Sequence, residues 1–305
     1  MKLFHPKIVL AAIDVDESSV SVLQGARDLA DAAGATLHVV NVAPSKAGRE
    51  APTQPDDTER KRAIRPLLDR AHLTAANVPV HLLAGEPAHA IRSLADGVHA
   101  DVIVLGRHRD RRPPSSGQRL GSTALGVVTN SWAPCLVLSK SMRLPIERVL
   151  VPVDLSETSR GALVVGLSWA SALRGARKGV GSATDETVSL TALFVDKSAA
   201  SADRSSSQPR ALEDELSRLR ADAGQWAGVT VSGATRSGND VGAAIADVAH
   251  ENGCDLLVLG TRGLGLDDVG RLGSVSLAVA RRVEAPILLV PPAVWRTYAG
   301  SSHPA

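Results

Sequence analysis

Residues 255–276 read DLLVLGTRGLGLDDVGRLGSVS and join an apolar run to a glycine-rich loop and then to a helical pattern. We expect a buried strand over 255–259 and a helix that begins near Gly273 and Ser274. Glycines let a backbone approach an anion closely, and the free N–H groups at the start of a helix point toward it. The spacing G-x2-G-x9-G-S therefore predicts a phosphate-binding loop between the strand and the helix.

The chain carries its strand pattern twice, in the same order and at similar offsets. The matching segments are Lys7–Asp14 with Arg148–Asp154, Asp101–Gly106 with Asp255–Gly260, and Ala133–Leu138 with Ala285–Val290. Such a repeat indicates a tandem duplication with a join near Ser141–Ile146. We therefore predict two domains, residues 1–142 and residues 143–305, each of a size that suits a single domain.

Each half alternates apolar strand runs with amphipathic helical patterns. In the first half we expect strands at 7–13, 36–42, 78–83, 101–105 and 135–139, and helices at 18–33, 57–76, 87–98 and 121–131. In the second half we expect strands at 148–153, 188–195, 228–234, 255–259 and 286–290, and helices at 157–173, 209–226, 239–252 and 273–283. The alternation predicts βαβ units with right-handed crossovers, so each half is expected to be an α/β, doubly wound parallel sheet of the Rossmann-like class. Ligands of such sheets bind beyond the carboxyl ends of the strands, where Asp154 and Gly260 are expected to lie.

The composition is that of a globular protein with an aliphatic core. The 305 residues are 44% hydrophobic and 22% charged, and only 2% are aromatic. The formal net charge of +2 gives no whole-chain argument for nucleic-acid binding. Cys135 and Cys254 suggest no disulfide framework, and no apolar run approaches the roughly 18 residues that span a bilayer. We expect a reducing, cytoplasmic setting and no membrane partner.

With the repeat, the strand-end aspartates and the glycine loop together, the chain resembles the universal stress protein family in its tandem, two-domain type. The resemblance runs from about Lys7 to Pro291, and the second half matches the family's nucleotide motif in full. It implies the adenine nucleotide α-hydrolase-like variant of the fold. It also implies that the final strands, Cys135–Ser139 and Ile287–Val290, pair within one chain as an internal pseudo-dimer; further association into a homodimer stays open.

The resemblance implies an adenine-nucleotide site in the second half. The expected binding residues are Pro152, Val153, Asp154, Val195, Gly260, Gly263, Gly273, Ser274, Val275 and Ser276. The segment ending at Asp154 would hold adenine and ribose, Val195 would flank the base, and the glycines and the helix start would meet the phosphates. A carboxylate accepts ribose hydroxyls, whereas a phosphate needs N–H and O–H donors. The residues alone leave three alternatives open: glycines that serve only a turn, Ser274 as a helix N-cap, and Asp154 as an N-cap or turn residue.

The first half departs from this pattern. Gly106 is followed by Arg109 where the second glycine is expected, and eleven residues rather than nine precede Gly121. A side chain then stands where the backbone should approach a phosphate, so we do not expect ordinary ATP binding there. Asp14 and residues 121–123 keep some anion or nucleotide binding open. The basic loop 107–119 either binds phosphates through arginine side chains or is a solvated surface loop.

The sequence shows no candidate catalytic residues and no candidate metal ligands. Nine histidines are scattered without metal spacing, the two cysteines lie in or beside apolar strands, and no Walker loop supplies a phosphate-binding lysine. Arg262 and Arg271 lie near enough to the glycine loop to add positive charge.

We therefore expect a stress-response regulator that binds ATP or a related adenine nucleotide in its second domain. AMP or ADP in place of ATP, and Mg²⁺ with the phosphates, stay open, and the protein partners are unknown. Two alternatives remain. One is an enzyme, either a slow ATPase or one that handles adenylates; the other is a nucleotide-free protein-interaction scaffold.

Overall fold

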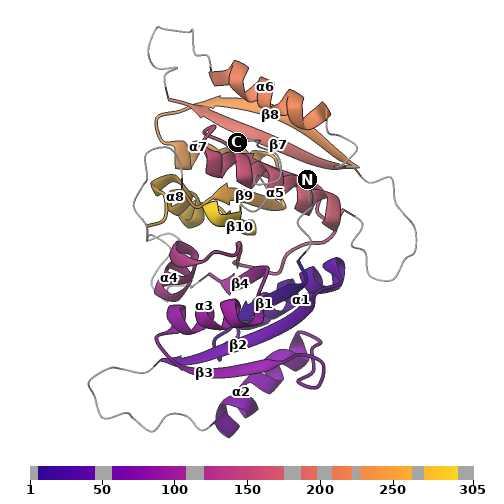
Figure 1. The fold of residues 1–305 in the computed structure, drawn as a ribbon, viewed down its shortest axis with the longest axis vertical. Helices are drawn as coiled ribbons and strands as arrows, with labels where there is room; N and C mark the ends of the chain where they lie inside the picture. Colours follow the sequence, from indigo (N-terminus) through magenta and orange to yellow (C-terminus); the bar gives the residue numbers. More distant parts are fainter. Residues whose placement is uncertain are drawn as a thin grey trace, which may run out of the picture.

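A computed structural model describes residues 6–44, 57–107, 120–174, 187–197, 208–221, 226, 228–262 and 271–294. Within these ranges the strands form one ten-stranded sheet in the order β3-β2-β1-β4-β5-β10-β9-β6-β7-β8 (Figure 1). The first five strands in the chain belong to one half of the sheet and the last five to the other. The strand order reverses beside β1 and beside β6, which is the doubly wound arrangement that the sequence predicts.

The elements alternate as expected in both halves. The first half contains β1 (Ile8–Ala12), α1 (Ser19–Ala33), β2 (Thr36–Pro44), α2 (Asp57–Arg70), β3 (Val80–Gly85), α3 (Pro87–Val98), β4 (Val102–Gly106), α4 (Ser122–Asn130) and β5 (Cys135–Leu138). The second half contains β6 (Arg148–Pro152), α5 (Glu157–Leu173), β7 (Val188–Asp196), α6 (Gln208–Ala221), β8 (Val229–Ser237), α7 (Val241–Glu251), β9 (Leu256–Gly260), α8 (Ser274–Arg282) and β10 (Ile287–Val290). The predicted α/β class is therefore confirmed element by element.

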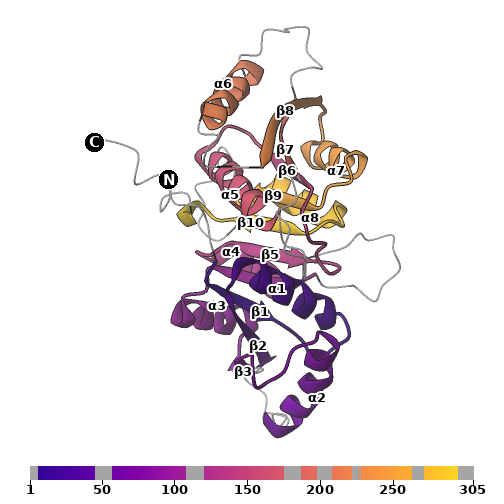
Figure 2. The same ribbon diagram turned by 90° about the vertical axis from the view of Figure 1, so that its right-hand side faces the viewer.

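The helices cover both faces of the sheet in two layers (Figure 2). One core cluster holds Leu23 of α1, Ile64 of α2 and Leu163 of α5 against the strands, and α6 joins this layer. The other holds α3, α4, α7 and α8 against the opposite face. Successive strand side chains point to opposite faces, so the apolar runs of the inner strands are buried on both sides, whereas the edge strands β3 and β8 are partly exposed.

The two halves meet at the centre of the sheet, where β5 and β10 pair antiparallel. Leu288 lies opposite Leu136, and Leu289 opposite Cys135. This confirms the predicted pairing of the final strands and covers two strand edges that would otherwise be exposed. Every other strand pair is parallel, so the strands of the two halves run in opposite directions, and their carboxyl ends lie at opposite edges of the sheet.

One predicted helix extends too far along the sequence. The expected helix 57–76 ends at Arg70, and the chain turns at His72, which has a φ of 56° and so cannot continue a right-handed helix. The apolar spacing beyond Arg70 belongs to this turn, which buries Leu73 in the same core as α2. The expected helix 209–226 corresponds to α6, and residues 222–225 of that prediction lie outside the described residues.

The helix pair α3–α4 in the first half and the equivalent pair α7–α8 in the second half each pack through one glycine and one alanine. The glycine lies on the second helix in the first half and on the first helix in the second half. A Cβ added to Gly242 of α7 would lie 2.6 Å from the Cβ of Ala278 in α8. A Cβ added to Gly126 of α4 would lie 2.8 Å from the Cβ of Ala88 in α3. Each helix pair therefore approaches closely enough to accommodate a single methyl group between its axes.

Within the part of the chain that the structure describes, no helix has both the length and the apolar character needed to cross a lipid bilayer.

Candidate nucleotide-binding site

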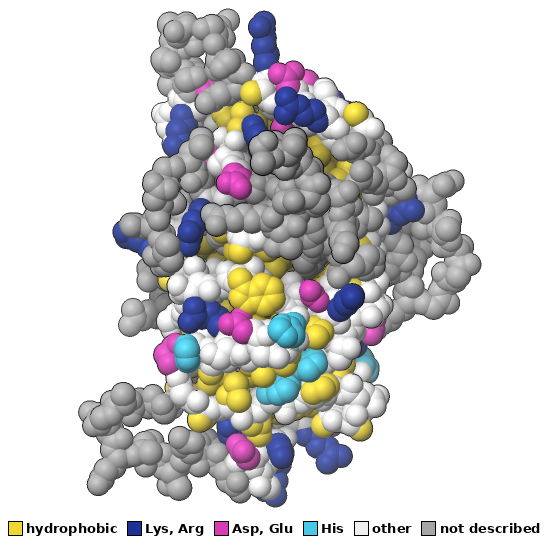
Figure 3. Space-filling model, viewed as in Figure 1, with side chains coloured by type: hydrophobic (Ala, Val, Ile, Leu, Met, Phe, Trp, Pro, Cys, Tyr) yellow, Lys and Arg dark blue, Asp and Glu magenta, His cyan; other side chains and the backbone are white. Residues whose placement is uncertain are grey.

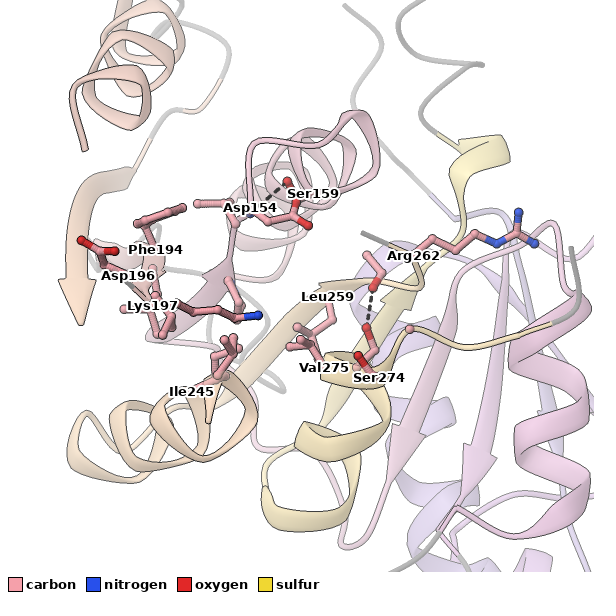
Figure 4. A pocket seen from close by; sticks show the side chains of 18 residues that line it. Asp154, Ser159, Phe194, Asp196, Lys197, Ile245, Leu259, Arg262, Ser274 and Val275 are labelled. Carbon is pink, nitrogen blue, oxygen red and sulfur yellow. Dashed lines mark hydrogen bonds between the residues drawn. The ribbon is translucent and has the colours of Figure 1, made fainter. Parts of the chain in front are cut away.

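A cavity of about 470 Å³ lies at the carboxyl ends of β6, β7 and β9, the edge at which doubly wound sheets bind ligands. Nine of the ten predicted binding residues line it: Pro152, Val153, Asp154, Val195, Gly260, Gly273, Ser274, Val275 and Ser276. The tenth, Gly263, lies outside the described residues. Segments between Pro152 and Ser276 that are far apart in the sequence are thus brought around one cavity, as Figure 4 shows.

Asp154 is fixed by the turn that joins β6 to α5. Its backbone N–H donates to Ser159 Oγ at 3.3 Å, and one carboxylate oxygen accepts from the Ser156 N–H at 3.0 Å. Ser156 itself caps α5, because its side chain accepts from the Ser159 N–H at 3.2 Å. Asp154 is therefore a turn residue and not an N-cap, and the same turn holds its carboxylate on the cavity wall (Figure 4).

The opposite wall is the start of α8. Its N-cap is Gly273, which makes no side-chain capping hydrogen bond, so the alternative of Ser274 as N-cap is wrong. By contrast α3, α5 and α7 are capped by Glu86, Ser156 and Asp240. The first N–H groups of an α-helix have no partner within the helix. At α8 they face a cavity instead of a capping side chain, which suits an anion.

The end of β9 and the start of α8 are held together by two hydrogen bonds. The Gly273 N–H donates to the Thr261 carbonyl at 2.9 Å, and the buried Ser276 hydroxyl donates to the Gly260 carbonyl at 2.8 Å. The proton of Ser276 is therefore used inside the protein, and this side chain positions the loop rather than donating into the cavity. A Cβ on Gly260 would lie 2.8 Å from Thr158 Cγ2, which is why this position requires glycine.

Several lining residues are not among the predicted binding residues. Leu193 and Phe194 of β7, Ile245 of α7 and Leu259 of β9 give the cavity an apolar end. Asp196 and Lys197 follow at the end of β7, and Figure 4 shows the Lys197 side chain directed into the cavity. Their position in the sequence could have predicted them, because residues at the carboxyl end of a parallel strand are expected at the edge of the sheet where ligands bind.

The charged groups around this cavity are balanced among the described residues. Asp154 and Asp196 oppose Lys197 and Arg262. The Arg262 guanidinium points away from the other labelled side chains in Figure 4, so Lys197 supplies the nearer positive charge. Such a cavity offers donors to an anion and an apolar surface to a ring.

A second cavity, of about 530 Å³, occupies the equivalent place in the first half. It lies at the carboxyl ends of β1, β2 and β4, beside the start of α4. Asp14, Gly106 and residues 121–123 line it, as the repeat predicts. Arg109 and the rest of the basic loop, residues 108–119, lie outside the described residues.

Arg107 is the described part of the basic loop, and its role was not predicted. It is 4% exposed, and its Nη1 donates from the first half to the carbonyl of Val283 in the second half, at the end of α8. Burial lowers the pKa of this guanidinium to about 10, and the nearby Glu284 raises it in part, so the group stays charged at neutral pH. Ser139 and Lys140 bind the same turn through the Glu284 carbonyl at 2.6 Å and its carboxylate at 2.7 Å.

The cysteines and histidines do not form a reactive centre among the residues that the structure describes. Burial raises the pKa of both thiols, Cys135 and Cys254, to about 12, so neither is a thiolate at neutral pH. No group of three or more His, Cys, Asp or Glu side chains in the described ranges could hold a metal ion. His38 and His81 do stack, with ring nitrogens 3.0 Å apart, on neighbouring strands. In the view of Figure 3, several histidine side chains gather on one face over the first half of the chain.

The comparison with known families rests on nearly the whole chain. A model described as the universal stress protein family matches residues 6–139 and 145–291, one match in each half. The chain belongs to the universal stress protein family. It is 31% identical over 114 residues to Universal stress protein A homolog 1 of Coxiella burnetii (strain RSA 493 / Nine Mile phase I), which covers 34% of this chain and 78% of that relative.

Solved structures share the fold of this universal stress protein over both halves. A universal stress protein from Archaeoglobus fulgidus DSM 4304 matches with a TM-score of 0.70 and 20% identity, over 94% of this chain and 98% of that chain. A protein of unknown function from Pseudomonas aeruginosa PAO1 matches with a TM-score of 0.66 and 13% identity, over 97% and 96%. At these identities the likeness shows the fold alone.

Proposed function

We propose that this universal stress protein binds ATP or a related adenine nucleotide in the cavity of its second half, and that it acts in the cytoplasm as a stress-response regulator rather than as a catalyst. The observation that carries the proposal is the convergence of nine predicted residues around one cavity whose far wall is an uncapped helix start.

The two ends of the cavity suit the two ends of the ligand. The side chains of Leu193, Val195 and Ile245 offer an apolar surface to a base, and the Asp154 carboxylate can accept hydrogen bonds from ribose hydroxyls. The N–H groups at the start of α8 and the ammonium of Lys197 can donate to phosphate oxygens. Each polar wall therefore meets a ligand group of opposite hydrogen-bonding character.

Regulation would then follow from population shift. A nucleotide that contacts β6, β7 and α8 at once favours the conformations in which these elements keep their present spacing. A partner that recognises those conformations would bind the loaded protein more tightly, by the reciprocity of linked equilibria.

Calorimetric titration of the purified chain, stripped of bound nucleotide, tests this proposal. We expect one ATP per chain, and we expect Asp154→Ala to weaken binding about 10- to 100-fold, because a hydrogen bond to a charged group contributes about 1.5–3 kcal/mol. The matched control is Asp14→Ala at the equivalent position of the first half, which should leave this binding unchanged. Absence of ATP binding in the wild-type chain would favour the scaffold alternative.

The same samples separate a binding protein from an enzyme. Phosphate release should not exceed that of free ATP in buffer, with Mg²⁺ or with a chelator. A release rate that rises with the wild-type chain and falls with Asp154→Ala would establish an ATPase instead.

A further inference from the structure

The end of α8 is held by the other half of the molecule. Arg107 directly follows β4 and is buried, and its Nη1 donates to the carbonyl of Val283, the C-cap of α8. Ser139, directly after β5, adds a second hydrogen bond, from its Oγ to the Glu284 carbonyl at 2.6 Å. Two first-half residues therefore bind the turn in which this second-half helix ends.

The equivalent helix of the first half closes its end by itself. The repeat places Ser131, the C-cap of α4, at the position of Val283. The Ser131 Oγ donates to the Ala133 carbonyl at 2.8 Å and accepts from the Ala133 N–H at 3.1 Å. Valine has no hydrogen-bonding side chain, so α8 cannot close its end in this way. A guanidinium can serve instead, because it donates to the last carbonyls of a helix and its charge suits the negative end of the helix dipole.

Among the described residues this support runs in one direction only. Thr261 stands in the second half where Arg107 stands in the first. The Arg107 N–H donates to the Leu138 carbonyl at 2.8 Å, and the Thr261 N–H donates to the Val290 carbonyl at 2.9 Å, so the two backbones are equivalent. Threonine lacks the long cationic side chain that makes the contact. The first half therefore supports a helix of the second half without receiving the same support in return.

Burial makes the contact of Arg107 with α8 costly to break. The guanidinium keeps its charge at neutral pH, and a buried charge must keep its hydrogen-bonding partners. Moving the end of α8 away would leave this buried charge with one acceptor fewer. The end of α8 is therefore held more firmly than an exposed ion pair would hold it.

The start of α8 depends on this support because it has no side-chain cap. Its first N–H groups point where the helix axis directs them. The bonds of Gly273 and Ser276 to the end of β9 hold the position of the start, but the direction of the axis also depends on where the other end lies. A helix of nine residues is only about 14 Å long, so a small shift at one end changes the direction at the other.

We propose that Arg107 is a positioning residue for the nucleotide site of the second half. By holding the end of α8, it sets the direction in which the start of α8 presents its N–H groups to phosphate. The inference rests on the proposed function, because it concerns the same cavity, and it adds that the first half completes this site. Arg107 acts through α8 alone, so its effect is confined to ligands that carry phosphate.

Titration of the full-length chain with ATP, and displacement of ATP by adenosine, test the inference. Arg107→Met removes the charge and the donors and keeps an unbranched side chain. We expect ATP affinity to fall about 5- to 10-fold, because phosphate then meets N–H groups that are less well aligned. Adenosine affinity should stay unchanged, because adenosine has no phosphate to reach α8. A merely structural role would lower the melting temperature and leave the ratio of the two affinities as in the wild-type chain.

Two further variants serve as matched controls. Arg107→Lys keeps a positive charge and a donor for the Val283 carbonyl, so it should recover most of the ATP affinity. Lys140→Met breaks the ion pair with Glu284 in the same turn, but both of these side chains are exposed, and such pairs contribute little. We therefore expect Lys140→Met to bind ATP as the wild-type chain does.

An unchanged ratio of ATP to adenosine affinity in Arg107→Met would overturn the inference. If that variant does not unfold cooperatively, Ser139→Ala gives the same comparison at an exposed residue, with an expected loss of about 2- to 3-fold in ATP affinity. An unchanged ratio there would overturn the inference as well.

The proposed function and this inference fail in different ways. A wild-type chain that binds no ATP would overturn the proposed function, and the inference with it. ATP binding that needs Asp154 but not Arg107 would leave the proposed function standing and contradict the inference alone.

Discussion

The two cavities of this chain have similar walls, and their described lining residues differ in charge. Both lie beyond parallel strands, both place an aspartate after the first strand, and both end at a helix whose N-cap is a glycine without a side-chain cap. They differ at the end of the second strand and after the first, where Lys197 and Ser156 face Pro44 and Asp16. The fold thus places a cavity at the equivalent edge of each half, and a few strand-end residues give the described walls of the two cavities different charges.

The largest expected effect comes from placing a negative charge at the start of α8. Ser274→Glu places a carboxylate at the first residue of α8, where it suits the helix N-terminus but repels phosphate. We expect ATP affinity to fall about 100-fold or more, which is about 2.7 kcal/mol. Ser122→Glu is the matched control, since Ser122 is the first residue of α4 and, like Ser274, is exposed. An equal loss of ATP affinity in both variants would show that the two helix starts contribute alike to ATP binding.

An intermediate effect is expected from the exchanged helix contacts. Gly242→Ala adds a methyl group 2.6 Å from Ala278, and overpacking of this kind costs about 1–3 kcal/mol. Adding Ala278→Gly copies the arrangement of Ala88 and Gly126 in the first half, so it should recover most of the loss. Urea denaturation of the single and double variants measures the coupling. Purely additive effects would show that the cost of the added methyl group does not come from its contact with Ala278.

The smallest effect concerns the histidine pair, which the second half lacks: strand register places Thr191 and Ala234 at the positions of His38 and His81. Burial, and secondarily the neighbouring His81, lower the pKa of His38, so the folded chain binds this proton less tightly than the unfolded chain. Its contribution to stability is therefore complete above the ordinary pKa of 6.5 and is lost as the pH falls through the lowered value.

Replacing the pair by the second-half residues, His38→Thr with His81→Ala, tests this contribution. The variant should lose a small part of the pH dependence of its urea midpoint between about pH 7 and pH 5. A wild-type midpoint that does not fall over this interval would show that the pair titrates alike in the folded and unfolded chains.

The fold could be predicted from the sequence because its signals are local and repeated. Most strands are apolar runs, and the repeat places the same run at the same position in each half. The exception is the edge strand β8, which is largely exposed and continues to Ser237, beyond the predicted end at residue 234. The end of α2 could not be predicted, because the apolar spacing continues past Arg70 into the turn at His72. Spacing alone does not distinguish a buried turn from another helical turn.

The candidate site could be predicted where glycine and strand-end positions define it. What the sequence did not show were contacts between distant segments. The bond from Arg107 to Val283 joins residues 176 positions apart, and the pair of His38 and His81 depends on the register of two strands. The hydroxyl of Ser276 could not be assigned either, because a serine at a helix start looks the same whether it faces a ligand or a backbone carbonyl.

The pairing of β5 with β10 within one chain determines which halves come together. Partners tethered in one chain meet at an effective concentration that dilution of the protein does not change. Each molecule therefore always contains one half of each kind, whereas two separate chains would also form pairs of like halves. With the pairing secured in this way, one cavity could accumulate substitutions while the other kept its original set of residues.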